Sequence, residues 1–357
     1  MKVAFITRST LYTAPGGDTV QIVQTAQQLA VMGINVEIFL SNDQINYEQF
    51  DLLHFFNIIR PADILYHSKK VKKPFFVSTI LCNYSEYDKY HRKGIGTLFR
   101  YLPAHSIEYL KTIARWILGR DHLISLDYTW KGQRKSIIEI LKRATMILPN
   151  SESEYRRVKQ NYFDNISYLV VPNGIDPELF KNDPLVIKDE LLVLCIARIE
   201  GIKNQLNLIK ALNNTRFRLL LIGAYAPNQV NYYHQCRNIA APNISFIDHI
   251  PQHKLLSYYR RAKVHILPSW FETTGLSSVE AAVMGCNIVI TDKGDTREYF
   301  EDGAFYCDPS EPKSILSAVE EASSAPFNEK LRQKILTQYT WKQAAIQTLK
   351  AYQSAIA

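Results

Sequence analysis

Short apolar runs alternate with helix-length amphipathic stretches along almost the whole chain. The expected strands occupy residues 2–7, 35–40, 51–56, 75–80, 145–149, 168–172, 191–197, 217–223, 244–247, 264–267, 287–291 and 304–307. The helical patterns include residues 18–32, 129–143, 151–162, 203–213, 252–261, 274–284 and a last helix at 341–356. Strands that alternate with helices predict parallel sheets covered by helices. The near-continuous apolar run at 191–197 fits a strand that is buried on both faces.

Each half of the 357 residues holds about six expected strands, enough for one doubly wound α/β domain. We therefore predict an N-terminal domain at 1–172, a linker at 173–189 rich in turn residues, and a second domain at 190–340. The last helix, within 341–357, could cover the second domain or cross back to the first. Two such domains would face each other across a cleft, and ligands would bind beyond the carboxyl ends of the strands.

The amino-acid composition excludes several classes of protein. Hydrophobic residues make up 46% and charged residues 21%, which excludes a disordered or coiled-coil chain. No apolar run is long enough for a membrane span or for a signal-peptide core, so we expect a cytoplasmic protein. The five cysteines are odd in number and form no Cys-x-x-Cys pair, which disfavours disulfides and zinc. The net charge of +8 suits an anionic partner: nucleic acid, a membrane surface or a phosphorylated substrate.

The segment that begins at Pro268 carries the densest set of polar residues at a strand end. Glu272 lies just before an expected helix start, and Glu280 lies eight residues further on, about two helical turns. Gly275 and its neighbours offer backbone N–H groups at the positive end of that helix, which favours phosphate. Each carboxylate could accept a pair of hydroxyl hydrogen bonds. The same spacing also fits a helix-terminus anion followed by a solvated glutamate.

Two cations occupy another strand-to-helix loop in the same half of the chain. Arg198 and Lys203 follow the strand at 191–197. Arginine can clamp phosphate oxygens bidentately, and lysine acts as a point charge. Taken alone, the pair also fits two solvated loop cations, but together with the Glu272 segment it favours a diphosphate site.

A glycine pair, Gly16 and Gly17, separates the first strand from the first helix. It permits close backbone approach to a ligand at a helix start, although a purely structural turn fits equally well. Neither the Gly-x-Gly-x-x-Gly fingerprint nor a P-loop is present.

These motifs together resemble a family 4 retaining glycosyltransferase of the GT-B fold, of the kind that builds bacterial surface polysaccharides. Glu272 and Glu280 match the family's E-x7-E motif, and Arg198 and Lys203 match its Arg and Lys after a strand. The segment Val-Pro-Asn-Gly-Ile-Asp at 171–176 matches its interdomain motif, and the glycine pair matches its N-terminal one. The likeness covers the C-terminal half throughout and the N-terminal half more loosely.

The resemblance implies metal-independent, retaining transfer of a hexosyl-type sugar from a nucleotide-diphosphate donor to a glycan or lipid-linked acceptor, without a further cofactor. Arg198 and Lys203 would bind the diphosphate, and Glu272 would hold donor-sugar hydroxyls. The remaining donor-binding candidates are Gly16, Gly17, Thr274, Gly275, Leu276, Glu280 for the ribose, and Ile250 near the base. The N-terminal domain would serve the acceptor, and the last helix would cross back to it.

The N-terminal half departs from the family pattern. Leu81 occupies the place of a common active-site His, which leaves His54 and Asn83 as weak acceptor-side candidates. His54 fits a half-buried structural histidine equally well. A nucleotide-sugar epimerase of the same fold, an inactive nucleotide-sugar-binding subunit and a basic nucleic-acid-binding protein are the alternatives. The last lacks any recognition motif, so we expect no nucleic-acid partner.

Residues 89–120 carry seven basic residues against one acid, Glu108, among many apolar ones. Ile113, Trp116, Ile117 and Arg120 fall at helical spacing, which predicts a basic amphipathic helix. Such a helix would suit peripheral binding to the anionic inner face of a membrane, where a lipid-linked acceptor would lie. Packing of its apolar side on the domain is the other interpretation.

Overall fold

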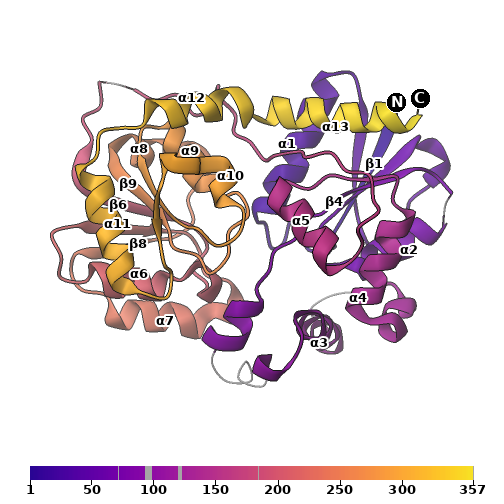
Figure 1. Ribbon diagram of the computed structural model, residues 1–357, viewed down its shortest axis with the longest axis horizontal. Helices are drawn as coiled ribbons and strands as arrows, with labels where there is room; N and C mark the ends of the chain where they lie inside the picture. Colours follow the sequence, from indigo (N-terminus) through magenta and orange to yellow (C-terminus); the bar gives the residue numbers. More distant parts are fainter. Residues whose placement is uncertain (71, 93–98, 120–122, 184, 357) are drawn as a thin grey trace. The chain divides into compact units, whose positions relative to one another are not determined.

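Two parallel sheets, one in each half of the chain, organise the fold (Figure 1). The computed structural model describes residues 1–70, 72–92, 99–119, 123–183 and 185–356. These divide into two compact units: the described parts of 1–85, 98–173 and 341–357 form the first, and those of 86–97 and 174–340 form the second. The prediction of two parallel α/β domains is confirmed. The change of unit at Asn173 and Gly174 falls at the start of the expected linker.

The first unit contains a five-stranded sheet in the order β2-β1-β3-β4-β5. Its strands are β1 (Lys2–Thr7), β2 (Asn35–Leu40), β3 (Leu52–Phe56), β4 (Phe75–Ser78) and β5 (Met146–Ile147), all parallel. The helices are α1 (Gly17–Val31), α2 (Pro61–Lys70), α3 (Ala104–Ile117), α4 (Leu126–Arg143), α5 (Glu152–Asn161) and α13 (Trp341–Ile356). This sheet reverses its order between β1 and β3, and the Gly16–Gly17 turn follows β1.

The second unit contains a six-stranded parallel sheet in the order β11-β10-β9-β6-β7-β8. Its strands are β6 (Asp189–Ile196), β7 (Arg218–Ile222), β8 (Ile244–Ile247), β9 (Ala262–Leu267), β10 (Asn287–Thr291) and β11 (Phe305–Cys307). The helices are α6 (Gln205–Leu212), α7 (Val230–Ile239), α8 (Gln252–Arg261), α9 (Leu276–Val283), α10 (Thr296–Phe300), α11 (Pro312–Ser324) and α12 (Glu329–Gln338). Counted from β6, this is the strand order of dinucleotide-binding sheets, with its switch point between β6 and β9.

The core of the second unit explains why its strands were visible in the sequence. Val193 and Leu194 of β6 are fully buried and pair with Val264 and His265 of β9. Helices cover both faces of such a sheet, so nearly every position of a central strand must be apolar.

Three expected elements differ from the structure. Residues 168–172 form no regular strand; Tyr168 makes a single bridge to Ile147, and the N–H groups of Leu169 and Val171 donate to the carbonyls of Ile147 and Pro149. The helix expected at 203–213 begins at Gln205, because a short 3-10 turn at Gly201–Lys203 and a left-handed Asn204 (φ 59°) precede it. The helix expected at 274–284 begins at Leu276, after a left-handed Gly275 (φ 69°).

The last helix, α13, groups with the first unit and packs against α1. Tyr352 of α13 is fully buried, and its hydroxyl lies 2.5 Å from Nδ1 of His54 on β3. Both termini of the described chain therefore lie in the first unit (Figure 1). Across the described residues, every helix is too short or too polar to cross a membrane.

Candidate active site

The loops after β6 and β9 meet at the switch point of the second sheet, where α/β folds bind ligands. The first loop carries Arg198 and Lys203, and the second carries Glu272 and Gly275. Asn204 links the loops, because its side-chain amide donates to the carbonyl of Pro268 at 3.0 Å and to that of Pro309 at 2.7 Å. The sequence placed these residues on separate loops, and the fold brings the loops together.

Lys203 and Glu272 form an ion pair at the centre of this site. The Lys203 ammonium lies 2.7 Å from Oε2 of Glu272, and the side chains are only 22% and 10% exposed. Burial lowers the pKa of Lys203, but the charge and hydrogen bond of Glu272, together with the charge of Glu200, outweigh burial, so the pKa of Lys203 is raised. The fold therefore holds a protonated, oriented cation at the strand ends.

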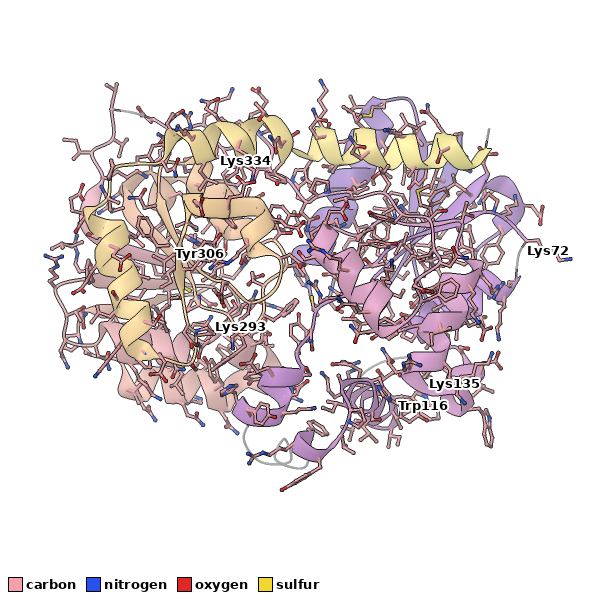
Figure 2. The ribbon with its side chains drawn as sticks, viewed as in Figure 1. Lys72, Trp116, Lys135, Lys293, Tyr306 and Lys334 are labelled. Carbon is pink, nitrogen blue, oxygen red and sulfur yellow. The ribbon has the colours of Figure 1, made fainter. Side chains whose placement is uncertain are left out.

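Hydrogen bonds to the side chain and to the backbone of Glu272 together orient its carboxylate. The Ser269 hydroxyl donates to Oε2 at 2.9 Å. The Glu272 N–H donates to the carbonyl of Lys293 at 3.0 Å, and the Asp295 N–H donates to the carbonyl of Glu272 at 2.9 Å. Gly294 allows this contact, because a Cβ there would lie 2.0 Å from the Glu272 carbonyl oxygen. Figure 2 labels Lys293, which belongs to this supporting loop between β10 and α10.

Arg198 is the more accessible of the two cations. Its side chain is 48% exposed and lies 3.1 Å from Oε1 of Glu200. An exposed guanidinium on a strand-end loop can turn toward an anionic ligand and bind it bidentately.

The chain enters α9 beside Glu272 through Thr274, Gly275 and Leu276. Thr274 is 1% exposed, and Leu276 is the first residue of the helix. A side chain at Gly275 would be strained by the positive φ and would place its Cβ 3.0 Å from Ile290. The positive end of the α9 dipole therefore lies next to the Lys203–Glu272 pair.

Glu280 lies about one turn after the start of α9 and is only partly exposed. Its Oε1 accepts a hydrogen bond from Gln252 at 2.7 Å, and its Oε2 accepts one from the Tyr259 hydroxyl at 2.7 Å. Burial raises the pKa of Glu280 to about 7, although both hydrogen bonds act to lower it. Ile250, two residues before α8, packs against the core of this unit.

The remaining predicted site residues belong to the first unit. α1 begins at Gly17, and the loop before it is fixed by Arg8, which pairs with Asp18 at 2.7 Å and donates to the carbonyl of Ala14 at 2.9 Å. Asn83 is exposed and accepts hydrogen bonds from Ser85. The roles of Gly16, Gly17 and Asn83 stay predictions.

His54, the other acceptor-side candidate, is buried in the core of the first unit, as expected of a structural histidine, and a role toward an acceptor stays a prediction. The ring is 1% exposed, bonded to Tyr352 and to the Ser78 hydroxyl at 2.9 Å, and stacked on Phe56. Burial lowers its pKa to about 3, so it stays neutral. This histidine, in the apolar run Leu-Leu-His-Phe-Phe, is therefore held by the core of the first unit.

Sequence patterns missed one segment of the site: residues 86–92, from the first half of the chain, belong to the second unit. Tyr87 contacts Gly201, and His91 stacks on Trp270. A short polar and aromatic stretch has no periodicity that would have revealed this. Within the described ranges, no three His, Cys, Asp or Glu side chains gather to hold a metal ion.

Comparison with known proteins agrees with this geometry. Residues 177–339, which lie in the second unit, match the family model of glycosyl transferases group 1. A curated relative, the D-inositol 3-phosphate glycosyltransferase of Stackebrandtia nassauensis, is 23% identical over 397 residues and covers 96% of this chain and 87% of its own.

Solved structures extend the likeness to the whole fold. Sucrose-phosphate synthase from Thermosynechococcus elongatus aligns with a TM-score of 0.77 at 16% identity, over 100% of this chain and 99% of its own. HepE from Anabaena, in complex with UDP, aligns with a TM-score of 0.64 at 17% identity, over 100% of this chain and 98% of its own. Structural neighbours of this kind have the GT-B fold, so the predicted fold is confirmed.

Proposed function

Because the chain is a glycosyltransferase of the GT-B fold with a group 1 domain in its second unit, we propose that it transfers a hexosyl-type sugar from a nucleotide-diphosphate donor, with retention of anomeric configuration and without a metal. The observation that carries this proposal is the buried Lys203–Glu272 pair at the switch point. The cation can bind the diphosphate of a nucleotide-sugar donor, and the carboxylate beside it can accept hydrogen bonds from the hydroxyls of the attached sugar.

In the proposed reaction, the bond between the anomeric carbon and the donor phosphate oxygen breaks, and its electron pair leaves with the nucleoside diphosphate. An acceptor hydroxyl oxygen bonds to the same carbon, and its proton passes to the departing phosphate oxygen. The departing diphosphate gains negative charge, which Lys203, Arg198 and the α9 N-terminus would stabilise. The chain contains no Asp-x-Asp motif, so these groups take the role that a metal plays in transferases built on that motif.

Glu272 would orient the donor sugar. A carboxylate has about four lone-pair positions, and Lys203 and Ser269 occupy only part of them. The free positions can accept donor-sugar hydroxyls next to the bond that breaks. HepE, which shares the fold of this chain, was solved in complex with UDP, and this supports a nucleotide as a ligand of this chain.

Glu280 would bind the ribose hydroxyls, and its raised pKa predicts a pH-dependent affinity for nucleoside diphosphate. Since the charged carboxylate is the better hydroxyl acceptor, affinity should rise about tenfold between pH 6 and pH 8. Titration calorimetry with wild type and Glu280→Gln in the same buffers checks this. Titration of the ligand itself affects both proteins alike, so the difference between wild type and Glu280→Gln reports on Glu280. Parallel pH profiles for the two proteins would contradict the ribose role.

The raised pKa of Glu280 also predicts how the stability of the fold changes with pH. The pKa of Glu280 is about 7 in the fold and near 4.5 in the unfolded chain, so the native state holds the extra proton between these values. Stability from this group is present below the lower value and is lost as pH rises through about 7. Thermal melts of wild type should show this loss, and those of Glu280→Gln should not.

We further propose that α3 and the start of α4 place the first unit on an anionic membrane surface. Leu110, Ala114, Ile117 and Leu118 fall on one helical stripe, and the three larger side chains are 45%, 72% and 63% exposed. α3 and α4, which pack together, carry seven Lys or Arg against three Asp or Glu. Figure 2 labels Trp116 on α3 and Lys135 on α4. Lys93 and Arg120, part of the predicted basic stretch, lie outside the described residues.

Exposed apolar side chains beside net positive charge favour an anionic lipid surface, where each cation contributes about 1 kcal/mol. Ile117→Ser with Leu118→Ser should reduce co-sedimentation with anionic vesicles several-fold at low salt. Ile187→Ser is the matched control, because Ile187 is 92% exposed in the second unit. Equal binding of wild type to neutral and anionic vesicles would contradict the proposal.

The transfer itself is tested by incubating pure protein with a panel of nucleotide sugars and acceptor extracts, in EDTA. Release of nucleoside diphosphate that depends on acceptor, with an α-linked product from an α-linked donor, supports the proposal. An epimerised nucleotide sugar would indicate the epimerase alternative, and binding without turnover would indicate an inactive binding subunit.

A further inference from the structure

Residues 86–92, here called the strap, contact three loops of the second unit. The strap contains one helical turn, Tyr87–His91, and is braced internally by Arg92, whose guanidinium lies 3.2 Å from the buried carboxylate of Asp88. The loops it contacts follow β6, β9 and β10, and the first two carry Lys203 and Glu272.

The first contact joins Tyr87 to Gly201, two residues before Lys203. A Cβ at Gly201 would lie 1.7 Å from the Tyr87 hydroxyl oxygen, so no side chain at 201 is compatible with the docked strap. The Gly201 N–H donates to Gln229 at 3.2 Å, which fixes the same loop from the other side. The strap thus rests directly on the turn that presents Lys203.

The second contact is an aromatic stack of His91 on Trp270. The ring centroids lie 3.5 Å apart with an interplanar angle of 14°, and Trp270 is only 5% exposed. Trp270 precedes Glu272 by two residues, and its backbone N–H donates to the carbonyl of Ile202 at 2.9 Å. Displacement of Trp270 would therefore disturb both loops of the ion pair.

The third contact is an ion pair between Glu86 and Lys293. The ammonium of Lys293 also lies 5.5 Å from the centroid of the Trp270 ring. The backbone carbonyl of Lys293 accepts a hydrogen bond from the backbone N–H of Glu272. The three contacts thus converge on the backbone around one carboxylate.

We propose that the strap is a positioning element of the donor site, in which His91 and Tyr87 hold the loops that orient Glu272 and Lys203. The proposal rests on the transferase function above and adds residues that no strand-end motif contains. Tyr87 and His91 act through Gly201 and Trp270 respectively, so they are positioning residues. Small misplacement of groups at a reacting centre can cost about 100-fold in rate.

The first test compares two substitutions of His91. His91→Ala removes the stack and should lower kcat at least about tenfold, while the affinity for product nucleoside diphosphate stays within about twofold of wild type. His91→Phe keeps an aromatic ring on Trp270 and should recover most of the rate. Tyr90→Ala is the matched control, because Tyr90 lies in the same turn and is 60% exposed. A phenylalanine variant as slow as the alanine variant would overturn the positioning role.

The second test uses the steric fit at Gly201. Gly201→Ala should lower kcat by displacing Tyr87, and adding Tyr87→Ala should restore part of the rate by making room. Such coupling is expected only for residues in direct contact. Independent, additive losses would contradict the proposal.

Hydrogen exchange of residues 268–275 gives a readout that needs no turnover. Wild type should protect this loop, and His91→Ala and Gly201→Ala should lose the protection. If no donor is turned over by wild type but the exchange pattern appears, the transferase proposal fails and the docked strap stands. Turnover with unchanged exchange in both variants would reject the strap alone.

Discussion

Replacement of Lys203 by alanine is expected to lower kcat about 100- to 1,000-fold, which is the usual cost of removing one preorganised group that stabilises developing charge. Lys203 is the best-oriented cation of the site, 2.7 Å from Glu272 and largely buried. Steady-state kinetics with the identified donor checks this. Arg198→Ala should act in the same direction, since the exposed guanidinium serves the same diphosphate.

Control variants distinguish a loss of catalysis from a loss of the folded structure. Lys210→Ala removes an exposed lysine from neighbouring α6 and should leave kcat unchanged. Loss of Lys203 alone leaves a buried carboxylate without its cation, which can destabilise the unit. Lys203→Met combined with Glu272→Gln removes both charges and should therefore fold well and remain inactive. Full activity in Lys203→Ala and Arg198→Ala, or activity that EDTA abolishes, would contradict the assignment.

Replacement of Glu272 by glutamine is the second large expected effect. Hydrogen bonds to a charged acceptor are worth about 1.5–3 kcal/mol, so kcat should fall about 10- to 100-fold. Discrimination between donor sugars that differ at a hydroxyl should also weaken, because the carboxylate is proposed to contact those hydroxyls. Rates for a matched set of donors check both parts.

Glu178→Gln is the control for this substitution, because that carboxylate is 82% exposed and pairs with Lys181, three residues along the chain. Product nucleoside diphosphate should bind Glu272→Gln nearly as well as wild type, since the diphosphate is held by other groups. A large loss of product affinity with an unchanged donor preference would assign Glu272 to the nucleotide instead of the sugar.

Much of the second unit was predictable from sequence. Its strands are buried on both faces, and a run such as 191–197 leaves few other structures possible. The strand-end positions of Arg198, Lys203 and Glu272 followed from that pattern. Their ion pair did not, because the pairing of β6 with β9 joins residues about 70 apart in the chain.

The errors have local physical causes. Asn204 and Gly275 adopt left-handed backbone conformations, so both helices of the site begin two residues later than their apolar pattern predicts. Residues 168–172 have an apolar strand-like pattern but make only one bridge. The partner of His54, Tyr352, and the docking of the strap on Trp270 could not be predicted, because these residues come from distant parts of the sequence.

The central claim is that side-chain cations at the carboxyl edge of the second sheet bind the donor diphosphate. Its most direct test is titration calorimetry of the pure chain with UDP, GDP and ADP in EDTA, repeated with Lys203→Ala. We expect at least one nucleotide to bind wild type in EDTA and to bind Lys203→Ala about tenfold or more weakly, as loss of a charge-assisted contact implies. Equal affinity for both proteins, or binding only with added Mg²⁺, would contradict the claim.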